Sequence, residues 1–121
     1  MTKVLLVDDT LSQLDLMEVY LGESGYTVIR INDPKSAIKQ AIQHKPDVII
    51  TDVVMPGMSG FELCRYFKKN PETNRIPVVI CSSKNQDIDR IWGMRQGAAA
   101  YLTKPFSKEQ LIRIVELALV A

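Results

Sequence analysis

The sequence has few of the residues that hydrolytic enzymes and thiolate metal sites depend on. It contains one histidine, His44, and two cysteines, Cys64 and Cys81, among 121 residues. His44 lies beside Lys45 and Pro46, where a helix is expected to end, so a Ser–His or Cys–His catalytic pair has little support. The cysteines lack a metal-type spacing and have apolar neighbours. We therefore expect reduced, buried thiols and no disulfide.

The sequence also lacks an excess of charge and a long apolar run. It has 15 basic and 14 acidic residues and a formal net charge of +1, so nothing indicates a nucleic-acid or membrane-surface partner. The first apolar run, 4–7, ends at Asp8 and Asp9, whereas a signal peptide needs about 7–15 apolar residues and a membrane span about 20. The lack of such a run predicts a cytoplasmic protein without membrane insertion. The length of 121 residues predicts one domain.

Short apolar runs alternate with segments of helical period. The runs are 4–7, 26–31, 48–51, 76–81 and 99–102. The helical sets are Leu14, Met17 and Leu21; Ala37, Ile38, Ala41 and Ile42; Phe61, Leu63, Cys64 and Phe67; Ile88, Ile91 and Trp92; and Leu111, Ile114, Val115 and Ala118. Runs rich in Val and Ile suit strands buried on both faces of a parallel sheet, whose connections are crossover helices. The sequence predicts an α/β fold, a doubly wound five-stranded (βα)5 sheet, since a closed barrel needs about eight strands.

Capping residues mark several predicted helix ends. Asp33 followed by Pro34 suits a helix start, and Ser107 can cap the last helix with Gln110 three residues on. Gly97 suits the end of the helix before the last apolar run. These signals agree with the boundaries that the apolar runs predict.

Polar residues follow four of the predicted strands, at the sheet edge where ligands bind in such folds. They are Asp8–Asp9, Asp52, Ser82–Ser83 and Thr103–Lys104–Pro105. Each alone is more often a cap or a turn, but four strand ends that agree indicate one site. Crowded carboxylates favour a hard cation such as Mg²⁺, and a lysine and a hydroxyl suit an oxyanion. The set predicts phosphoryl transfer with an aspartate nucleophile.

Four segments carry a resemblance to a known family: VLLVDD at 4–9, IITDVVMPGMSGFEL at 49–63, PVVICSS at 77–83 and GAAAYLTKPF at 97–106. In order and spacing they resemble response-regulator receiver domains of the CheY-like single-domain type. The resemblance implies the flavodoxin-like (CheY-like) fold with strand order 2-1-3-4-5. Because the predicted elements use residues 4 to about 120, we expect one receiver domain at 1–121 without an effector domain. We expect this domain to act as a signalling protein and not as an enzyme.

The resemblance also implies the roles of the acidic residues and the lysine. Asp52 is the phosphoacceptor. Asp8, Asp9, Asp52 and the backbone carbonyl of Val54 hold Mg²⁺. Lys104 pairs with the phosphoryl oxygens, and the bond from this lysine to the next proline is usually cis in the family.

Two more residues are switch residues by the same resemblance. Ser82 turns its hydroxyl toward the phosphoryl group, and Tyr101 alternates between an outward and an inward rotamer. The implied phosphodonor is a histidine kinase or a histidine phosphotransfer protein. The implied output is a downstream signalling or motility protein, which binds the face formed by the strand at 99–102 and the two helices on either side of it along the chain.

Some residues distinguish this chain from many receivers. Val54 and Lys84 stand where many relatives have polar or acidic side chains, which predicts a long-lived phosphoryl group.

The segment 92–98 resembles single-domain receivers of twitching motility and phototaxis. Trp92 in this segment is expected either to pack half-buried or to belong to the output surface.

The last helix carries more apolar residues than one face needs. Ile112, Leu119 and Val120 lie outside its apolar stripe. Either the buried face is broad, or these residues form a partner or dimer surface, so we expect a monomer or a weak dimer.

Three other functions fit the residues less well. A phosphatase of the haloacid dehalogenase type would have Asp-x-Asp after the first strand and a substrate-enclosing cap. A flavin carrier would have a Ser/Thr/Gly-rich loop where Asp8 and Asp9 would repel its phosphate. A scaffold that has lost phosphorylation would have no need of the complete set of polar residues.

Overall fold

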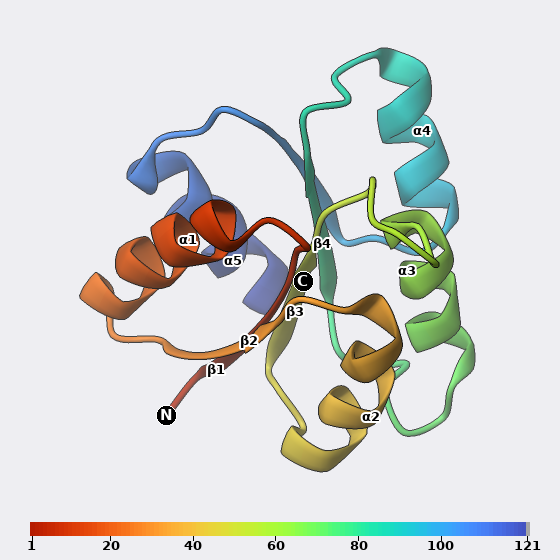
Figure 1. Cartoon of the computed structure of the whole chain (residues 1–121), viewed down its shortest axis with the longest axis horizontal. Coiled ribbons are helices and arrows are strands. Elements are labelled where there is room, and N and C mark those ends of the chain that lie inside the picture. The colour runs from red at the N-terminus through yellow and green to blue at the C-terminus, as the bar shows by residue number, and fades with distance from the viewer. Residues whose placement is uncertain (121) are drawn as a thin grey trace.

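The structure, a computed structural model, describes residues 1–120, in which five strands alternate with five helices (Figure 1). The strands are β1 (Lys3–Val7), β2 (Thr27–Ile31), β3 (Val48–Thr51), β4 (Val78–Ser82) and β5 (Ala100–Thr103). The helices are α1 (Leu11–Glu23), α2 (Pro34–His44), α3 (Gly60–Lys69), α4 (Asp87–Arg95) and α5 (Lys108–Leu119). Every strand overlaps its predicted apolar run, with ends that differ by at most two residues.

The strands form one parallel sheet in the order β2-β1-β3-β4-β5, which confirms the predicted fold class and strand order. In its register Val7 lies beside Thr51, and Ser82 lies beside Thr103. The loops that follow β1 and β3 therefore leave the sheet side by side, as do those that follow β4 and β5. This register brings distant parts of the sequence together at one edge.

Helices cover both faces of the sheet, with α1 and α5 on one face and α2, α3 and α4 on the other (Figure 1). Successive residues of a strand point to opposite faces, so Leu5 packs in the core beneath α2 and α3 while Leu6 packs beneath α1 and α5. Both faces of a central strand are buried, so none of its side chains needs to be polar. This is why the central strands are nearly continuous apolar runs.

The predicted helix caps are confirmed. The Asp33 side chain accepts a hydrogen bond from the Lys35 N–H ahead of α2. Ser107 and Gln110 form a reciprocal capping box at the start of α5, with hydrogen bonds of 3.1 and 2.8 Å. Gly97 follows α4 with a φ of 99°, a left-handed conformation that suits glycine.

The apolar set that the sequence shows on α4 does not pack in the core. Ile88, Ile91 and Trp92 are 63%, 50% and 46% exposed, and Gly93 is the buried residue of this helix. A Cβ atom on Gly93 would lie 3.1 Å from both Ile80 and Tyr101, so α4 approaches the sheet closely through its glycine. The apolar side chains consequently face outward, and Trp92 is half exposed.

For α5 the sequence left two alternatives, a broad buried face or an exposed partner surface, and its apolar residues include examples of both. Ile112 and Leu119 are partly buried and pack against the core beneath this helix, as a broad buried face would have them. Leu117 and Val120 are exposed. Within residues 1–120, no helix combines the length and the apolar character needed to cross a bilayer.

Both cysteines are buried and free, as expected. Burial raises the pKa of Cys64 to about 11 and that of Cys81 to about 12. In an unfolded chain a thiol has a pKa of about 8.5. The folded state therefore holds these two protons to a higher pH than the unfolded state does.

We predict that these thiols weaken the fold in alkali. Above about pH 9 the unfolded chain binds fewer protons than the folded chain, so the free energy of unfolding falls as pH rises, by up to about 1.4 kcal/mol per pH unit for each thiol. Urea unfolding at pH 8–10 should show a steeper decline for the wild type than for the Cys64→Ala/Cys81→Ala variant. Equal slopes would contradict this prediction.

Candidate functional site

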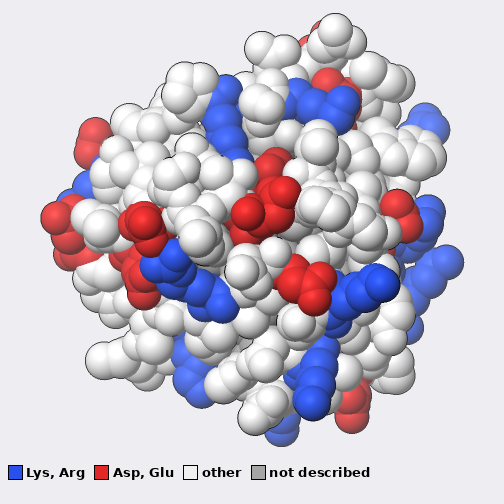
Figure 2. Space-filling view, viewed as in Figure 1, with Lys and Arg blue, Asp and Glu red and all other residues white. Residues whose placement is uncertain are grey.

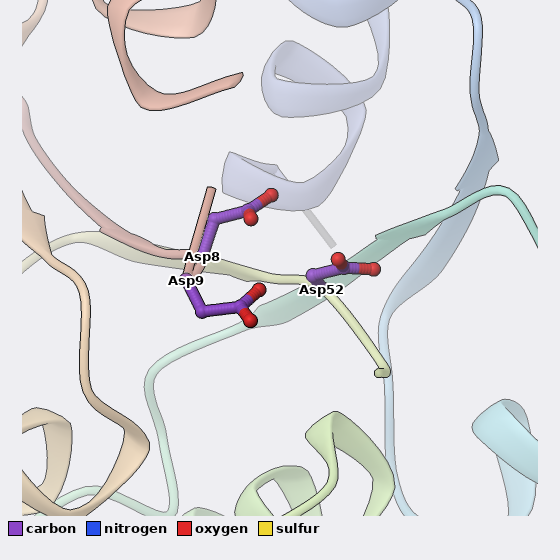
Figure 3. A group of neighbouring side chains, drawn as sticks. All are labelled: Asp8, Asp9 and Asp52. Atoms are coloured by element: carbon purple, nitrogen blue, oxygen red, sulfur yellow. The ribbon is translucent and has the colours of Figure 1, made fainter. Parts of the chain in front are cut away.

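Carboxylates from two strand ends meet at the carboxyl edge of the sheet. Asp8 and Asp9 follow β1, Asp52 follows β3, and one ligand oxygen of each lies within 4.8 Å of the others (Figure 3). The sequence predicted this meeting, and the parallel pairing of β1 with β3 produces it. It is the group of acidic residues from which the rest of the site is built.

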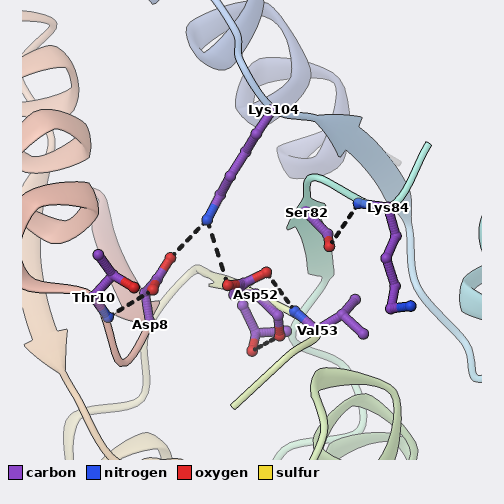
Figure 4. Close-up of polar contacts among 8 residues, drawn as sticks. Asp8, Thr10, Asp52, Val53, Ser82, Lys84 and Lys104 are labelled. Atoms are coloured by element: carbon purple, nitrogen blue, oxygen red, sulfur yellow. Dashed lines mark hydrogen bonds and ion pairs between the residues drawn. The ribbon is translucent and has the colours of Figure 1, made fainter.

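Asp8 is the most buried of the three. Its side chain is 1% exposed, and its Oδ1 accepts a hydrogen bond of 2.9 Å from the Thr10 N–H at the start of α1. Its Oδ2 lies 2.9 Å from the Lys104 Nζ (Figure 4). A buried carboxylate needs such partners, because desolvation without them is unfavourable. Asp9, by contrast, is exposed to solvent.

Lys104 joins two of the carboxylates. Its Nζ lies 2.9 Å from Asp8 and 3.5 Å from Asp52, and its bond to Pro105 is cis, as the resemblance implied. Burial by itself lowers the pKa of Lys104, but the hydrogen bond to Asp8 and the charge of Asp52 outweigh it and raise the pKa overall. The ammonium group therefore stays charged between the two carboxylates.

Asp52 is held from both sides but keeps access to solvent. Its Oδ1 accepts a hydrogen bond of 2.7 Å from the Val53 N–H, and its side chain is 14% exposed. Burial raises the pKa of Asp52, and Lys104 and the Val53 N–H oppose that effect. An aspartate in this setting is a partly desolvated carboxylate next to a cation, which suits a nucleophile toward phosphorus.

Gly60, the first residue of α3, lies against the main chain of Asp52 and was missed by the sequence analysis. A Cβ atom here would stand 1.8 Å from the Asp52 carbonyl oxygen. The Gly60 N–H donates to the Val53 carbonyl at 2.8 Å. The Ser59–Glu62 capping box that starts α3 is visible in the sequence, but only the folded chain shows that a side chain is excluded beside it.

Ser82 and Tyr101 meet the backbone of one residue, Lys84. The buried Ser82 Oγ accepts a hydrogen bond of 3.2 Å from the Lys84 N–H (Figure 4). The Tyr101 hydroxyl donates to the Lys84 carbonyl at 2.7 Å, and the tyrosine is 8% exposed, so its ring points inward. Ser82 and Tyr101 are thus linked through the backbone of one residue, Ser82 through its N–H and Tyr101 through its carbonyl.

Val54 follows the acidic group with its side chain 62% exposed. A hydrophobic side chain therefore stands at the open edge of the site, where many receivers have a polar one. Lys84, the other unusual residue, is also exposed. Val54 lies two residues after Asp52, and Lys84 lies two residues after Ser82.

The charge of the site fits a hard divalent cation. Three carboxylates face one ammonium group, which leaves two negative charges in excess. Figure 2 shows a small acidic patch near the middle of this face, with basic side chains on several sides of it. Carboxylate and carbonyl oxygens are the ligands that Mg²⁺ prefers, and one or two carboxylates are enough to hold it. Asp8, Asp9 and Asp52 are the residues that could do so.

Comparisons with known proteins agree on one family. A family model described as response regulator receiver domain matches residues 4–116. Protein PilH of Pseudomonas aeruginosa is 39% identical over 119 residues, with 98% of each chain covered. Chemotaxis protein CheY4 of Vibrio cholerae has a TM-score of 0.93 at 32% identity, covering 98% of this chain and 99% of that one. The receiver domain of sensor histidine kinase PA1611 of Pseudomonas aeruginosa, solved with a magnesium ion in its active site cleft, has a TM-score of 0.91 at 26% identity, covering 99% and 98%.

We predict that Gly60→Ala destabilises the fold and disturbs the site. The new methyl group would overlap the Asp52 carbonyl, so α3 must move away, which should lower the free energy of unfolding by about 2 kcal/mol or more. Gly22→Ala in α1 is the matched control, because nothing lies within 4 Å of its Cβ position. Chemical denaturation measures both, and equal effects would contradict the prediction.

Proposed function

Because the chain belongs to the response regulator receiver domain family, we propose that it is a response regulator whose Asp52 accepts a phosphoryl group from a phosphohistidine. The donor is a histidine kinase or a histidine phosphotransfer protein. One observation carries this proposal above the others: Asp52 lies 3.5 Å from the Lys104 ammonium and beside two further carboxylates, and its side chain keeps partial access to solvent.

The residues of the site divide the chemistry of transfer between them. A carboxylate oxygen of Asp52 forms the new O–P bond as the N–P bond of phosphohistidine breaks, and the released imidazole takes a proton from solvent. When Asp52 becomes an acyl phosphate, the negative charge lies on the phosphoryl oxygens, and the Lys104 ammonium is placed to pair with them. Asp8, Asp9, Asp52 and the Val54 carbonyl would hold Mg²⁺, which neutralises charge on the transferring group when bound.

The phosphoryl group then selects a conformation. On this proposal Ser82 gives up its contact with the Lys84 N–H and turns its hydroxyl toward the phosphate, while Tyr101 favours its inward rotamer. The resulting change lies on α4, β5 and α5, the face that binds a downstream protein. Phosphorylation can shift the two states only by the contacts that differ between them.

The biological setting we propose is motility. The similarity to PilH extends over nearly the whole of both chains, which favours pilus-based motility over the chemotaxis and phototaxis settings. In this setting the chain acts in the cytoplasm as a monomer or weak dimer, as a signalling protein and not as an enzyme with a product of its own. The exposed Trp92 on α4 fits a place in the output surface.

The phosphatase and flavin-carrier alternatives receive less support. A flavin phosphate would meet the carboxylates of Asp8 and Asp9 directly after β1, where it needs backbone N–H groups and no negative charge. A phosphatase of the haloacid dehalogenase type has its nucleophile after the first strand. Here Lys104 contacts a carboxylate after the first strand, Asp8, and one after the third, Asp52, but only the Asp52 side chain keeps access to solvent.

We expect acetyl phosphate with Mg²⁺ to modify Asp52. A mobility shift in a phosphate-affinity gel and a change in Trp92 fluorescence should appear for the wild type and disappear when Mg²⁺ is chelated. Asp52→Asn should abolish both responses, because an amide cannot form the acyl phosphate. The control is Asp87→Asn, which removes one exposed carboxylate at the start of α4 and should keep both responses. A shift that persists in Asp52→Asn would remove the proposal.

We also expect a slowly hydrolysed phosphoryl group. The exposed Val54 and Lys84 offer the attacking water neither a hydrogen-bond acceptor nor a negative charge beside Asp52. Val54→Asn and Lys84→Glu should each shorten the half-life of the phosphorylated protein, by about tenfold or less, the range of one polar contact in a transition state. The half-life is followed after removal of the phosphodonor. An unchanged rate in both variants would refute this idea.

A further inference from the structure

Arg90 of α4 lies against two residues of β5. Its guanidinium carbon is 5.5 Å from the centre of the Tyr101 ring, and its Nη2 donates a hydrogen bond of 2.6 Å to the Thr103 Oγ. Tyr101 and Thr103 are two residues apart in a strand, so their side chains project from the same face of the sheet. Arg90 therefore contacts both at once and ties α4 to β5.

The inward position of Tyr101 is enclosed on its other sides. The ring lies against Gly93, where a Cβ atom would be 3.1 Å from the ring, and a larger residue would compete for that space. The hydroxyl donates to the Lys84 carbonyl at 2.7 Å. Glycine thus provides room beside the ring, a carbonyl binds the hydroxyl, and the guanidinium covers the ring.

We propose that Arg90 is a positioning residue that holds Tyr101 inward before any phosphoryl group is present. This inference rests on the proposed function, in which Tyr101 is the aromatic switch. Its consequence is that the α4–β5 part of the output face is largely formed in the unphosphorylated protein. Phosphorylation then stabilises a conformation that is already populated.

The chemistry of arginine suits this task. A planar guanidinium can lie over an aromatic ring and donate in its own plane to a hydroxyl at the same time. A lysine ammonium is not planar, so it is less suited to contact the ring and Thr103 at the same time. Arg90 is exposed, so water competes with both contacts. We therefore expect these contacts to favour the inward position of the Tyr101 ring only moderately.

The test follows the Tyr101 ring by NMR in protein with ¹³C-labelled tyrosine rings, in Mg²⁺ buffer without a phosphodonor. The chain has four tyrosines, and Tyr101→Phe identifies the signal. In the wild type we expect strong ring contacts with Gly93. Arg90→Ala should lower the ratio of inward to outward ring by about five- to tenfold, the loss of one cation–π contact and one hydrogen bond at an exposed site.

Arg95→Ala is the matched control, since it removes the same charge from an exposed position on the same helix. It should leave the Tyr101 signal unchanged. Arg90→Lys should restore part of the inward population, and Thr103→Val, which removes only the hydrogen bond, should give an intermediate ratio. If Arg90→Ala and Thr103→Val both match the wild type, or if Arg95→Ala has the same effect as Arg90→Ala, the proposal is overturned.

A second arm adds beryllofluoride, which mimics the phosphoryl group. The Tyr101 signal should change little in the wild type and change strongly toward the inward form in Arg90→Ala. The first arm needs no modification of Asp52, so it reports on Arg90 even if Asp52 accepts no phosphoryl group. A large beryllofluoride-induced change at Tyr101 in the wild type would show that the ring was not already inward and would contradict the inference.

Discussion

The arrangement of the site depends on one interaction, the contact of the Lys104 ammonium with Asp8 and Asp52. Two desolvated carboxylates this close repel one another, and the ammonium between them offsets that repulsion at 2.9 and 3.5 Å. The Lys104 N–H also donates to the Ser82 carbonyl at 2.9 Å, so the same residue is tied through its backbone to the end of β4. The ends of β1, β3, β4 and β5 are thus held together by one lysine. The ammonium compensates one charge of the three carboxylates and leaves the excess that a divalent cation can take up.

This contact is possible only in the strand order of the sheet. β1 and β3 are neighbours, which brings the two acidic segments together, and β5 lies beyond β4, so a side chain as long as lysine is needed to reach them from there. Parallel strands align their carboxyl ends at one edge, and the loops that leave this edge for the crossover helices carry the polar residues of the site. The layout of the fold therefore prepares the site before any ligand binds.

The sequence predicted the sheet and the acidic group because these depend on simple patterns, namely apolar runs and strand ends, whereas the strand order came from the resemblance to receiver domains. It did not predict the orientation of α4, since an apolar set at helical spacing shows that a helix has an apolar face but not which neighbour that face meets. Ile88, Ile91 and Trp92 face outward because Gly93, which carries no hydrophobic signal, allows the helix to lie against the sheet. Gly60 and Arg90 were missed for a related reason. Their importance comes from a neighbour on another element: the Asp52 carbonyl, 1.8 Å from the Cβ position of Gly60, and the Tyr101 ring, 5.5 Å from the Arg90 guanidinium carbon.

The backbone of Lys84 offers a physical route from the proposed phosphorylation site toward α4 and β5. Its N–H donates to the Ser82 hydroxyl oxygen and its carbonyl accepts from the Tyr101 hydroxyl, so one residue of the loop after β4 contacts both of the proposed switch residues. If Ser82 turns toward a phosphate, the N–H must find another partner, because a backbone donor left without one is unfavourable when removed from water. On the proposed function, the loop around Lys84 would adjust to supply that partner, while Tyr101 stays inward. Arg90 contacts the same ring from the α4 side and would hold it inward during this change, so the loop, more than the ring, would carry the state of Asp52 toward α4.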